Sequence, residues 1–300
     1  MSFLFCASAM HEEIVRLLSC PICRKSIVFE GEKSSCHLLA GYLKCNSGHL
    51  CQVMEEIGLL KDAKLSANEF EWKINVADEK KYDETRKQYD SYFREDQKVA
   101  GNRMMGRLVS LVATSSKADK PVLDVATGMG TFILPLAEEV PPNALIIGTD
   151  IDERPLRGTM NRAKKAGTWE KLSLLVTDAK HLAFKNDSFS TISSYFGFDN
   201  VPETVLAFKE SSRVLREHGK MMFSSLWLEE GSESMRLAEQ HNVCQIASKE
   251  RLKNVLGSAD LVLEKVETVY SGIWPYNPMD LLPVEGDEYK HVIVQARKRG

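Results

Sequence analysis

The chain has 300 residues, 43% of them hydrophobic and 27% charged, and its formal net charge is −3 at pH 7. This length exceeds that of one typical domain, and this composition excludes a disordered chain. No apolar run approaches the roughly 18 residues of a transmembrane helix, so we expect a soluble protein without membrane association. Acidic residues equal or outnumber basic ones in each of the segments 1–62, 63–104 and 105–300, which argues against a basic nucleic-acid-binding module.

Cysteines are concentrated near the N-terminus, because all but one of the seven lie within residues 1–51. The first ten residues lack a basic leader and a convincing cleavage site, so we expect a cytoplasmic protein rather than an exported one. In a reducing compartment, clustered cysteines indicate metal binding more than disulfide formation.

Two pairs of candidate metal ligands occupy segment 1–62, a CxxC pair and a CxxxH pair: Cys20, Cys23, Cys45 and His49. Two such turns predict a tetrahedral site of three thiolates and one imidazole, for which zinc is the favoured metal. Cys51 or Cys36 could replace His49 as the fourth ligand. A closed site leaves no position for water, so we expect a structural zinc that stabilises a segment with a small apolar core.

Segment 63–104 is highly charged, with both signs interleaved and aromatic residues at helical intervals: Tyr82, Tyr89, Tyr92 and Phe93. This pattern predicts one or two helices with an inward aromatic face. We therefore expect three units: a zinc-ribbon domain at 1–62, a helical linker or lid at 63–104, and a larger domain at 105–300.

Strands and helices alternate through the third segment. Strand patterns at 122–127, 144–150, 172–178, 191–196 and 220–227 are separated by a connector and by helical patterns at 131–139, 155–166 and 201–216. Such alternation predicts an α/β fold with a doubly wound, Rossmann-like, mostly parallel sheet. The last two strand patterns, at 261–270 and 289–296, have no helix between them and predict an antiparallel C-terminal strand pair.

The strand ends carry the pattern of a nucleoside site. Gly128 and Gly130 lie where the first strand turns into a helix, and Asp150 ends the second strand. A carboxylate at that position can accept hydrogen bonds from ribose hydroxyls. Ile133 occupies the position where a dinucleotide site has a third small residue, so a dinucleotide is disfavoured. Asp178 and Ala179 end the next strand, where a carboxylate can accept from an adenine amine.

The passages LDVATGMG, GTDID, TDAKHLAFKNDSFS and SSYFGFDNVPE resemble class I S-adenosylmethionine-dependent methyltransferases, in particular the ubiquinone and menaquinone C-methyltransferases. The resemblance covers about residues 105–230. It implies that the cofactor S-adenosyl-L-methionine is held by a set of residues from four strand ends: Asp124, Gly128, Gly130, Asp150, Ile151, Asp178, Ala179, Phe196 and Gly197. Ala126 belongs to the implied cofactor-binding set as well; it stands where the family often has a glycine and would narrow the turn. A tyrosine that closes over the cofactor is also implied, with Tyr89 as first candidate and Tyr82 as second.

The passages CPICRKSI and LKCNSGHLCQVMEEIGLLK resemble the zinc ribbon of ribosomal-RNA guanine methyltransferases. That resemblance implies an RNA substrate, whereas the absence of basic excess favours a small, aromatic or apolar molecule. We therefore predict a methyltransferase with a small-molecule substrate, with RNA as the alternative and a non-catalytic binding module as a third possibility.

The loop between the last two strands offers an apolar substrate wall through Trp274, Tyr276 and Met279. Methyl transfer can proceed by positioning and desolvation without a dedicated base. If a base is required, Asp199 and His241 are the candidates.

Overall fold

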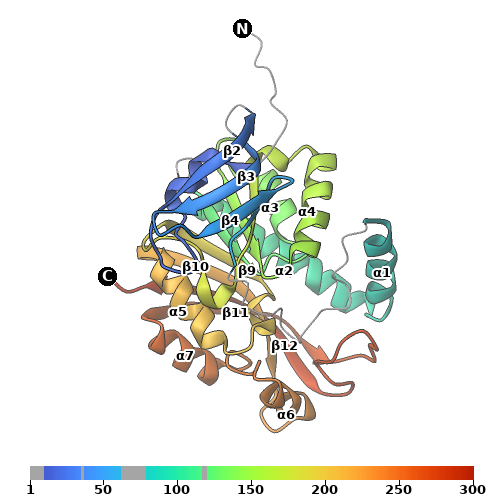
Figure 1. Cartoon of the computed structure of the whole chain (residues 1–300). Coiled ribbons are helices and arrows are strands. Elements are labelled where there is room, and N and C mark those ends of the chain that lie inside the picture. Colours follow the sequence, from blue (N-terminus) through green and yellow to red (C-terminus); the bar gives the residue numbers. More distant parts are fainter. Residues whose placement is uncertain (1–9, 35–36, 62–78, 117–119) are drawn as a thin grey trace.

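The computed structural model describes residues 10–34, 37–61, 79–116 and 120–300. Within these ranges, twelve strands form one continuous sheet, and eleven of them follow the order β1-β3-β4-β5-β8-β7-β6-β9-β10-β12-β11. The remaining strand, β2, pairs with β3. Figure 1 shows the N-terminal strands stacked at one end of this sheet and the C-terminal strand pair at the other.

The centre of the sheet is parallel, as the sequence predicts. It consists of β6 (Val122–Val125), β7 (Ile146–Asp150), β8 (Leu172–Val176), β9 (Phe189–Tyr195) and β10 (Leu215–Leu228). The two last strands, β11 (Leu261–Ile273) and β12 (Glu288–Lys298), are antiparallel to each other, and β12 lies between β10 and β11. The strand order reverses between β6 and β9, so the carboxyl ends of these strands border a crevice.

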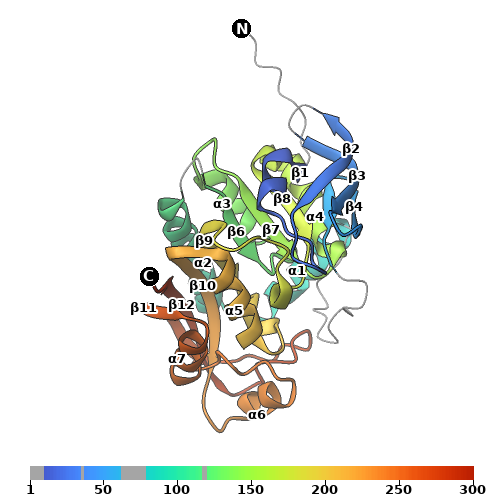
Figure 2. The ribbon, with the colours of Figure 1, turned by 60° about the vertical axis from the view of Figure 1, so that its left-hand side comes forward.

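Helices cover both faces of the sheet, and consecutive residues of β7 pack against opposite faces. Ile146 packs in the core with α2 (Glu95–Ser115), α3 (Ile133–Glu139) and α4 (Glu153–Ala166). Ile147 packs in the opposite core with α5 (Thr204–Val214) and α7 (Lys249–Ser258). The doubly wound prediction is therefore correct, and Figure 2 shows α3 and α5 on opposite sides of the parallel strands.

Element ends differ from the sequence pattern in the second half of the chain. The helix expected over 201–216 is shorter, because α5 begins only at Thr204 and β10 already begins at Leu215. Strand β10 is irregular between Leu215 and Lys220, where its register to β9 shifts. Two helices that the sequence analysis did not anticipate, α6 (Glu233–Gln240) and α7, connect β10 to β11.

The N-terminal segment consists of β1 (Met10–His11), the 3-10 helix η1 (Glu12–Leu17), β2 (Ile27–Ser34), β3 (His37–Cys45), β4 (Leu50–Met54) and β5 (Ile57–Leu59). Strand β5 pairs in parallel with β8, so this segment extends the main sheet. Its apolar residues Ile14 and Leu18 belong to the same core cluster as Phe184 and Phe189. The N-terminal segment and the larger predicted domain therefore share one sheet and one core cluster.

The expected linker corresponds to α1 (Glu79–Ser91) and α2. Helix α2 continues across the expected boundary between residues 104 and 105, since its buried positions Leu108 and Val112 pack on the sheet. The boundary between residues 62 and 63 lies outside the described residues. In the described part of the chain, no helix is long and apolar enough to cross a membrane.

Candidate active site

A cavity of about 290 Å³ opens at the carboxyl ends of β6, β7, β8 and β9. It is lined by every predicted cofactor-binding residue except Gly130: Tyr89, Asp124, Ala126, Gly128, Asp150, Ile151, Asp178, Ala179, Phe196 and Gly197. These residues come from separate strand ends and from α1, and the switch in strand order brings them together. The residues of the predicted nucleoside site therefore border one cavity.

Asp150 is anchored by two backbone amides. Its Oδ2 accepts a hydrogen bond from Gly128 N at 2.8 Å, and its Oδ1 accepts from Asp152 N at 3.0 Å. Asp152, rather than Asp150, caps α4. Burial raises the pKa of Asp150 to about 6, and the two amide hydrogen bonds oppose this rise. Each carboxylate oxygen has a second lone pair, so the site can accept hydrogen bonds from a vicinal diol.

Asp124 is fully buried in the first strand, with 1% of its surface exposed. Its Oδ1 accepts from Ser193 Oγ at 2.8 Å and its Oδ2 accepts from Thr127 Oγ1 at 2.8 Å. Desolvation is the main cause that raises its pKa to about 7, and the negative charge of Asp150 adds to the rise. The two carboxylates make this end of the cavity acidic and therefore suited to a cationic ligand group.

Asp178 is buried and caps the short 3-10 helix η3 (Ala179–His181) by accepting from Lys180 N at 2.8 Å. The following residues tie this turn to the N-terminal segment. Arg24, in the turn after Cys23, lies 2.9 Å from His181 Nδ1 through its Nη2, and the same nitrogen donates to Glu210 at 3.0 Å. Pro21 O lies 2.7 Å from His181 Nε2.

The turn after β6 has backbone conformations that favour glycine. Gly128 has φ of 55°, and Ala126 adopts φ of 54° despite its Cβ. Gly130 does not line the cavity, so its expected contact with the cofactor is corrected. A Cβ at Gly130 would lie 2.6 Å from the Thr159 side chain on α4, so this glycine permits helix packing.

Helix α1 covers the cavity with aromatic and basic side chains. Tyr89 and Tyr82 both line it, and Tyr82 OH lies 3.4 Å from Thr131 Oγ1. Arg86, between them on the same helix, lines it too and pairs with Asp90 at 3.0 Å. The sequence analysis considered the two tyrosines and missed Arg86, whose helical spacing from Tyr82 and Tyr89 was the available signal.

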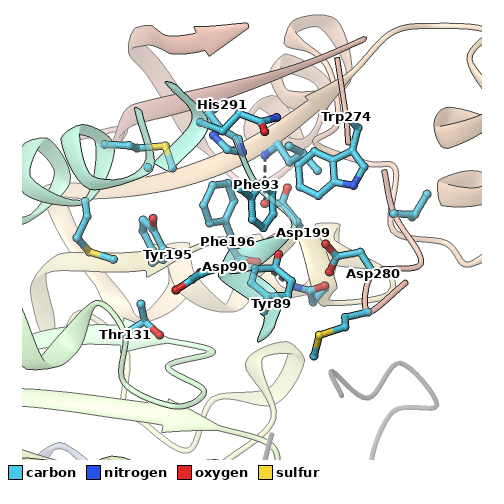
Figure 3. Close-up of a pocket in the computed structure, with 18 of the residues that line it drawn as sticks. Tyr89, Asp90, Phe93, Thr131, Tyr195, Phe196, Asp199, Trp274, Asp280 and His291 are labelled. Carbon is cyan, nitrogen blue, oxygen red and sulfur yellow. Dashed lines mark hydrogen bonds between the residues drawn. The ribbon is translucent and has the colours of Figure 1, made fainter. Parts of the chain in front are cut away.

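A second, larger cavity of about 850 Å³ adjoins the first, and the two share Tyr89, Thr131, Tyr195 and Phe196 among their lining residues. Figure 3 shows its aromatic lining, with Phe93, Tyr195, Phe196 and Trp274 around the cavity. Of the predicted substrate wall, Trp274 and Met279 line this cavity. Tyr276 does not, because it is 60% exposed and packs on Tyr92 outside.

Asp199 lies in the wall of the larger cavity. Its Oδ1 accepts from Ser225 Oγ at 2.7 Å, and its Oδ2 accepts from Leu226 N at 3.3 Å. Desolvation raises the pKa of Asp199 to about 7. The other candidate base, His241, is exposed at the C-terminal end of α6 and lines neither cavity, so the structure does not place it at the site. His291 on β12 lines the larger cavity and was missed.

The four predicted metal ligands meet at one point, with their ligand atoms all within 4.8 Å of one another: Cys20, Cys23, Cys45 and His49. Cys23 Sγ lies 3.7 Å from Cys45 Sγ, and Cys20 Sγ lies 3.4 Å from His49 Nδ1. A zinc tetrahedron with Zn–S bonds of about 2.3 Å has S–S edges of about 3.8 Å, so the group fits this metal. Cys51 is buried outside the cluster, and Cys36 lies outside the described residues.

The family model described as "Methyltransferase domain" matches residues 116–292 of the chain. The chain belongs to this methyltransferase family.

Curated relatives of this methyltransferase act in quinone biosynthesis according to their names. The demethylmenaquinone methyltransferase of Lactobacillus johnsonii is 31% identical over 105 residues, which cover 35% of this chain and 43% of that protein. The ubiquinone/menaquinone biosynthesis C-methyltransferase of Rickettsia massiliae is 35% identical over 104 residues, which cover 34% and 42% of the two chains. The matches thus span less than half the length of these relatives.

Solved structures share the methyltransferase fold at low sequence identity. A putative methyltransferase from Bacillus halodurans superposes with a TM-score of 0.52 and 16% identity, covering 65% of this chain and 99% of that one. The geranyl diphosphate C-methyltransferase of Streptomyces coelicolor, in complex with S-adenosyl-L-homocysteine, gives 0.53 and 13%, covering 66% and 76%. These likenesses support the methyltransferase fold over about two thirds of this chain.

Proposed function

We propose that this methyltransferase acts on a small, largely apolar and planar acceptor that binds in the larger cavity. The observation that carries this proposal is the cavity itself, because it adjoins the cofactor cavity through Phe196 and Tyr195 and has an aromatic lining. Its volume of about 850 Å³ lies in the range of small-molecule sites. The quinone-related names of the curated relatives agree with a planar acceptor.

The residues at the smaller cavity fit S-adenosylmethionine. We propose that Asp150 holds the ribose hydroxyls, that Asp178 and Ala179 border the adenine, and that the acidic end near Asp124 receives the methionine part. Tyr89 covers the cofactor from α1. The cofactor supplies a methyl group on a positively charged sulfur, and Phe196 lies where the two cavities meet. Aromatic walls exclude water from that region.

Asp199 is the proposed base. Its carboxylate lies in the wall of the acceptor cavity, and two donors on β10 hold its position. An acceptor with an acidic proton would transfer that proton to Asp199 as its nucleophilic atom attacks the methyl carbon.

An RNA substrate would require a basic surface. Two basic residues of α4 are paired with acidic residues: Arg157 with Glu55, and Lys164 with Glu56 at 2.9 Å. Both acids belong to the N-terminal segment, so the segment expected to recognise RNA neutralises this part of the surface. The small-molecule acceptor is therefore favoured.

We further propose that the Cys₃His cluster binds a structural zinc ion. Three thiolates and one imidazole form a complete tetrahedral donor set, which leaves no position for a substrate or water. A zinc ion bound there would hold the turn that contains Arg24 in place. It would thereby stabilise the contact of Arg24 with His181 on η3.

The deciding experiment measures methyl transfer from radiolabelled S-adenosylmethionine to two substrate sets, hydroxylated bicyclic aromatic molecules and total ribosomal RNA. We expect incorporation into the aromatic set alone. Incorporation into RNA without any into the small molecules would reject the proposed acceptor class, and binding of cofactor without transfer to either set would favour a non-catalytic module.

A further inference from the structure

The register of the C-terminal strands places His291 beside Asp199. On β10, Leu226 donates its amide to Asp199 Oδ2 at 3.3 Å, and on β12 the residue directly opposite Leu226 is His291. Opposed residues of an antiparallel pair project from the same face of a sheet. Leu226, His291 and Asp199 accordingly all line the larger cavity, and Figure 3 shows His291 and Asp199 around it.

His291 has an aromatic environment. Its ring centroid lies 5.2 Å from that of Phe196, 4.9 Å from that of Tyr289 and 6.3 Å from that of Tyr270. Its Nδ1 is buried without a hydrogen-bond partner among the described residues. A buried polar nitrogen in this state is costly unless a ligand bonds to it. This nitrogen can therefore form a hydrogen bond with a polar group of an acceptor that binds in the cavity.

The imidazole is neutral at physiological pH, because burial lowers the pKa of His291 to about 4. A neutral imidazole offers one donor and one acceptor, which suits an uncharged hydroxyl group. Other titratable groups line the cavity from four elements and one loop: Arg86, Tyr89 and Asp90 from α1, Lys98 from α2, Tyr195 from β9, Asp199 from η4 (Phe198–Asn200), and Asp280 from the β11–β12 loop. Arg86 and Asp90 pair with each other.

We propose that His291 is a positioning and specificity-determining residue, which hydrogen-bonds one hydroxyl group of the acceptor and holds it beside Asp199. This inference rests on the proposed small-molecule function and adds the residue that selects the hydroxyl. During transfer, the hydroxyl proton moves to the Asp199 carboxylate. The acceptor nucleophile forms a bond to the methyl carbon, the carbon–sulfur bond breaks, and its electron pair neutralises the sulfonium.

The test compares binding of two probes of the same shape, 2-naphthol and 2-methylnaphthalene, by calorimetry in the presence of S-adenosylhomocysteine. The wild-type chain should prefer the naphthol. In the His291→Phe variant this preference should fall by about tenfold, because the ring is kept and the hydrogen bond is lost. The two probes differ in hydration, but this difference is the same for each variant and cancels when variants are compared. A general loosening of the cavity would lower the affinity for both probes alike and leave the preference unchanged.

Two further variants complete the design. His241→Phe makes the same change at the exposed histidine outside both cavities and should leave the preference intact. His291→Asn restores a hydrogen-bonding group near the Nδ1 position and should recover most of the preference, even where His291→Phe folds poorly. Unchanged affinity for S-adenosylhomocysteine checks the fold, since His291 does not line the cofactor cavity.

The outcomes separate the inference from the proposed function. If the wild-type chain binds both probes and His291→Phe keeps the preference for naphthol, His291 has no positioning role and the inference alone is overturned. If the wild-type chain binds neither probe and transfers methyl groups to RNA, the proposed acceptor class and the inference are both overturned.

Discussion

Arg24 Nη2 lies 2.9 Å from His181 Nδ1, and this contact joins the metal-ligand turn to the cofactor cavity. Arg24 directly follows Cys23, a proposed zinc ligand, and His181 ends the turn that Asp178 begins. Pro21 O lies on the other side of the imidazole, 2.7 Å from His181 Nε2. The CxxC turn thus contacts both sides of the His181 imidazole, which belongs to the loop that borders the proposed adenine site.

The first prediction concerns metal removal. The wild-type chain should contain about one zinc per chain, and Cys45→Ala should lose it, because the variant retains three ligands. With the turn released, the melting temperature should fall and the Kd for S-adenosylhomocysteine should rise. Metal analysis, thermal melting and calorimetry measure the three effects. Cys244→Ala, which removes a half-buried cysteine that does not belong to the cluster, should retain metal and affinity.

A companion variant, His181→Ala, keeps the four proposed zinc ligands and removes the side chain that links their turn to the cofactor cavity. It should keep its zinc, since His181 is not a ligand, and still bind S-adenosylhomocysteine several-fold more weakly, because two side-chain contacts of about 1 kcal/mol each are lost. Wild-type cofactor affinity in this variant would show that the two sites are independent.

The second prediction concerns the proposed ribose acceptor. Asp150→Asn replaces a carboxylate by an amide of the same shape and should weaken S-adenosylhomocysteine binding by about 1–3 kcal/mol, the range for hydrogen bonds to charged groups. Calorimetry at pH 7.5, a value about one unit or more above the pKa, measures the change. Asp187→Asn is the matched control, because Asp187 is an exposed residue before β9, at the opposite ends of the strands.

The third prediction is the pH dependence of cofactor binding. The pKa of Asp150 is raised to about 6, so the carboxylate is ionised at pH 7.5 and becomes protonated below pH 6. Hydroxyl donors favour the ionised form, hence the Kd should increase as the pH falls below 6, by at most about tenfold per unit for this group. In Asp150→Asn, the Kd should lose the pH dependence that comes from Asp150 and keep the pH dependence that comes from Asp124. An equally steep dependence in the variant would exclude Asp150 as its source.

The fourth prediction concerns the base. The pKa of Asp199 is raised to about 7, so the group is protonated and inactive as a base below that value. With cofactor and acceptor saturating, the rate of transfer should rise with pH and level off above about 7. Asp199→Asn should be slower by about 10²–10⁴-fold, the usual contribution of a general base, and its rate should lose this inflection. A variant that keeps both rate and inflection would remove Asp199 from the mechanism.

The fifth prediction compares two glycines with positive φ. Gly167→Ala introduces backbone strain alone, because φ is 72° and a Cβ there meets open space. It should cost about 1–2 kcal/mol of unfolding free energy. Gly130→Ala, with φ of 76°, adds the approach to Thr159 and should cost about 1–3 kcal/mol more. Urea unfolding of both variants measures the difference, and equal losses would show that Thr159 moves aside freely.

Much of the central fold could be predicted because the chain alternates buried strands with amphipathic helices. The strand ends at Asp150 and Asp178 were correct to within a few residues, since parallel strands end at one edge of a sheet. The cavity residues followed from these ends. Gly130 was misassigned because sequence shows that a glycine is required and does not show whether a ligand or Thr159 requires it.

Other features depend on pairings between distant segments. Parallel pairing of β5 with β8 leaves no pattern in either strand, because each is a short apolar run. His291 lies in a strand whose register to β10 places it opposite Leu226, and that register is set by the whole C-terminal sheet. A histidine within the strand pattern EYKHVIV carries no such information.

The parallel pairing of Ile57 with Leu174 has a consequence for synthesis of the chain on the ribosome. The N-terminal strands are translated first, yet β5 gains its neighbour only after β8 has emerged. Until then, the edge of β5 and the apolar side chains of Ile14 and Leu18 have no partner in the later part of the chain. Contacts between such distant segments form slowly, and exposed strand edges aggregate. These N-terminal strands, which are translated before β8, are therefore completed late in folding, and early binding of the proposed zinc would stabilise them until then.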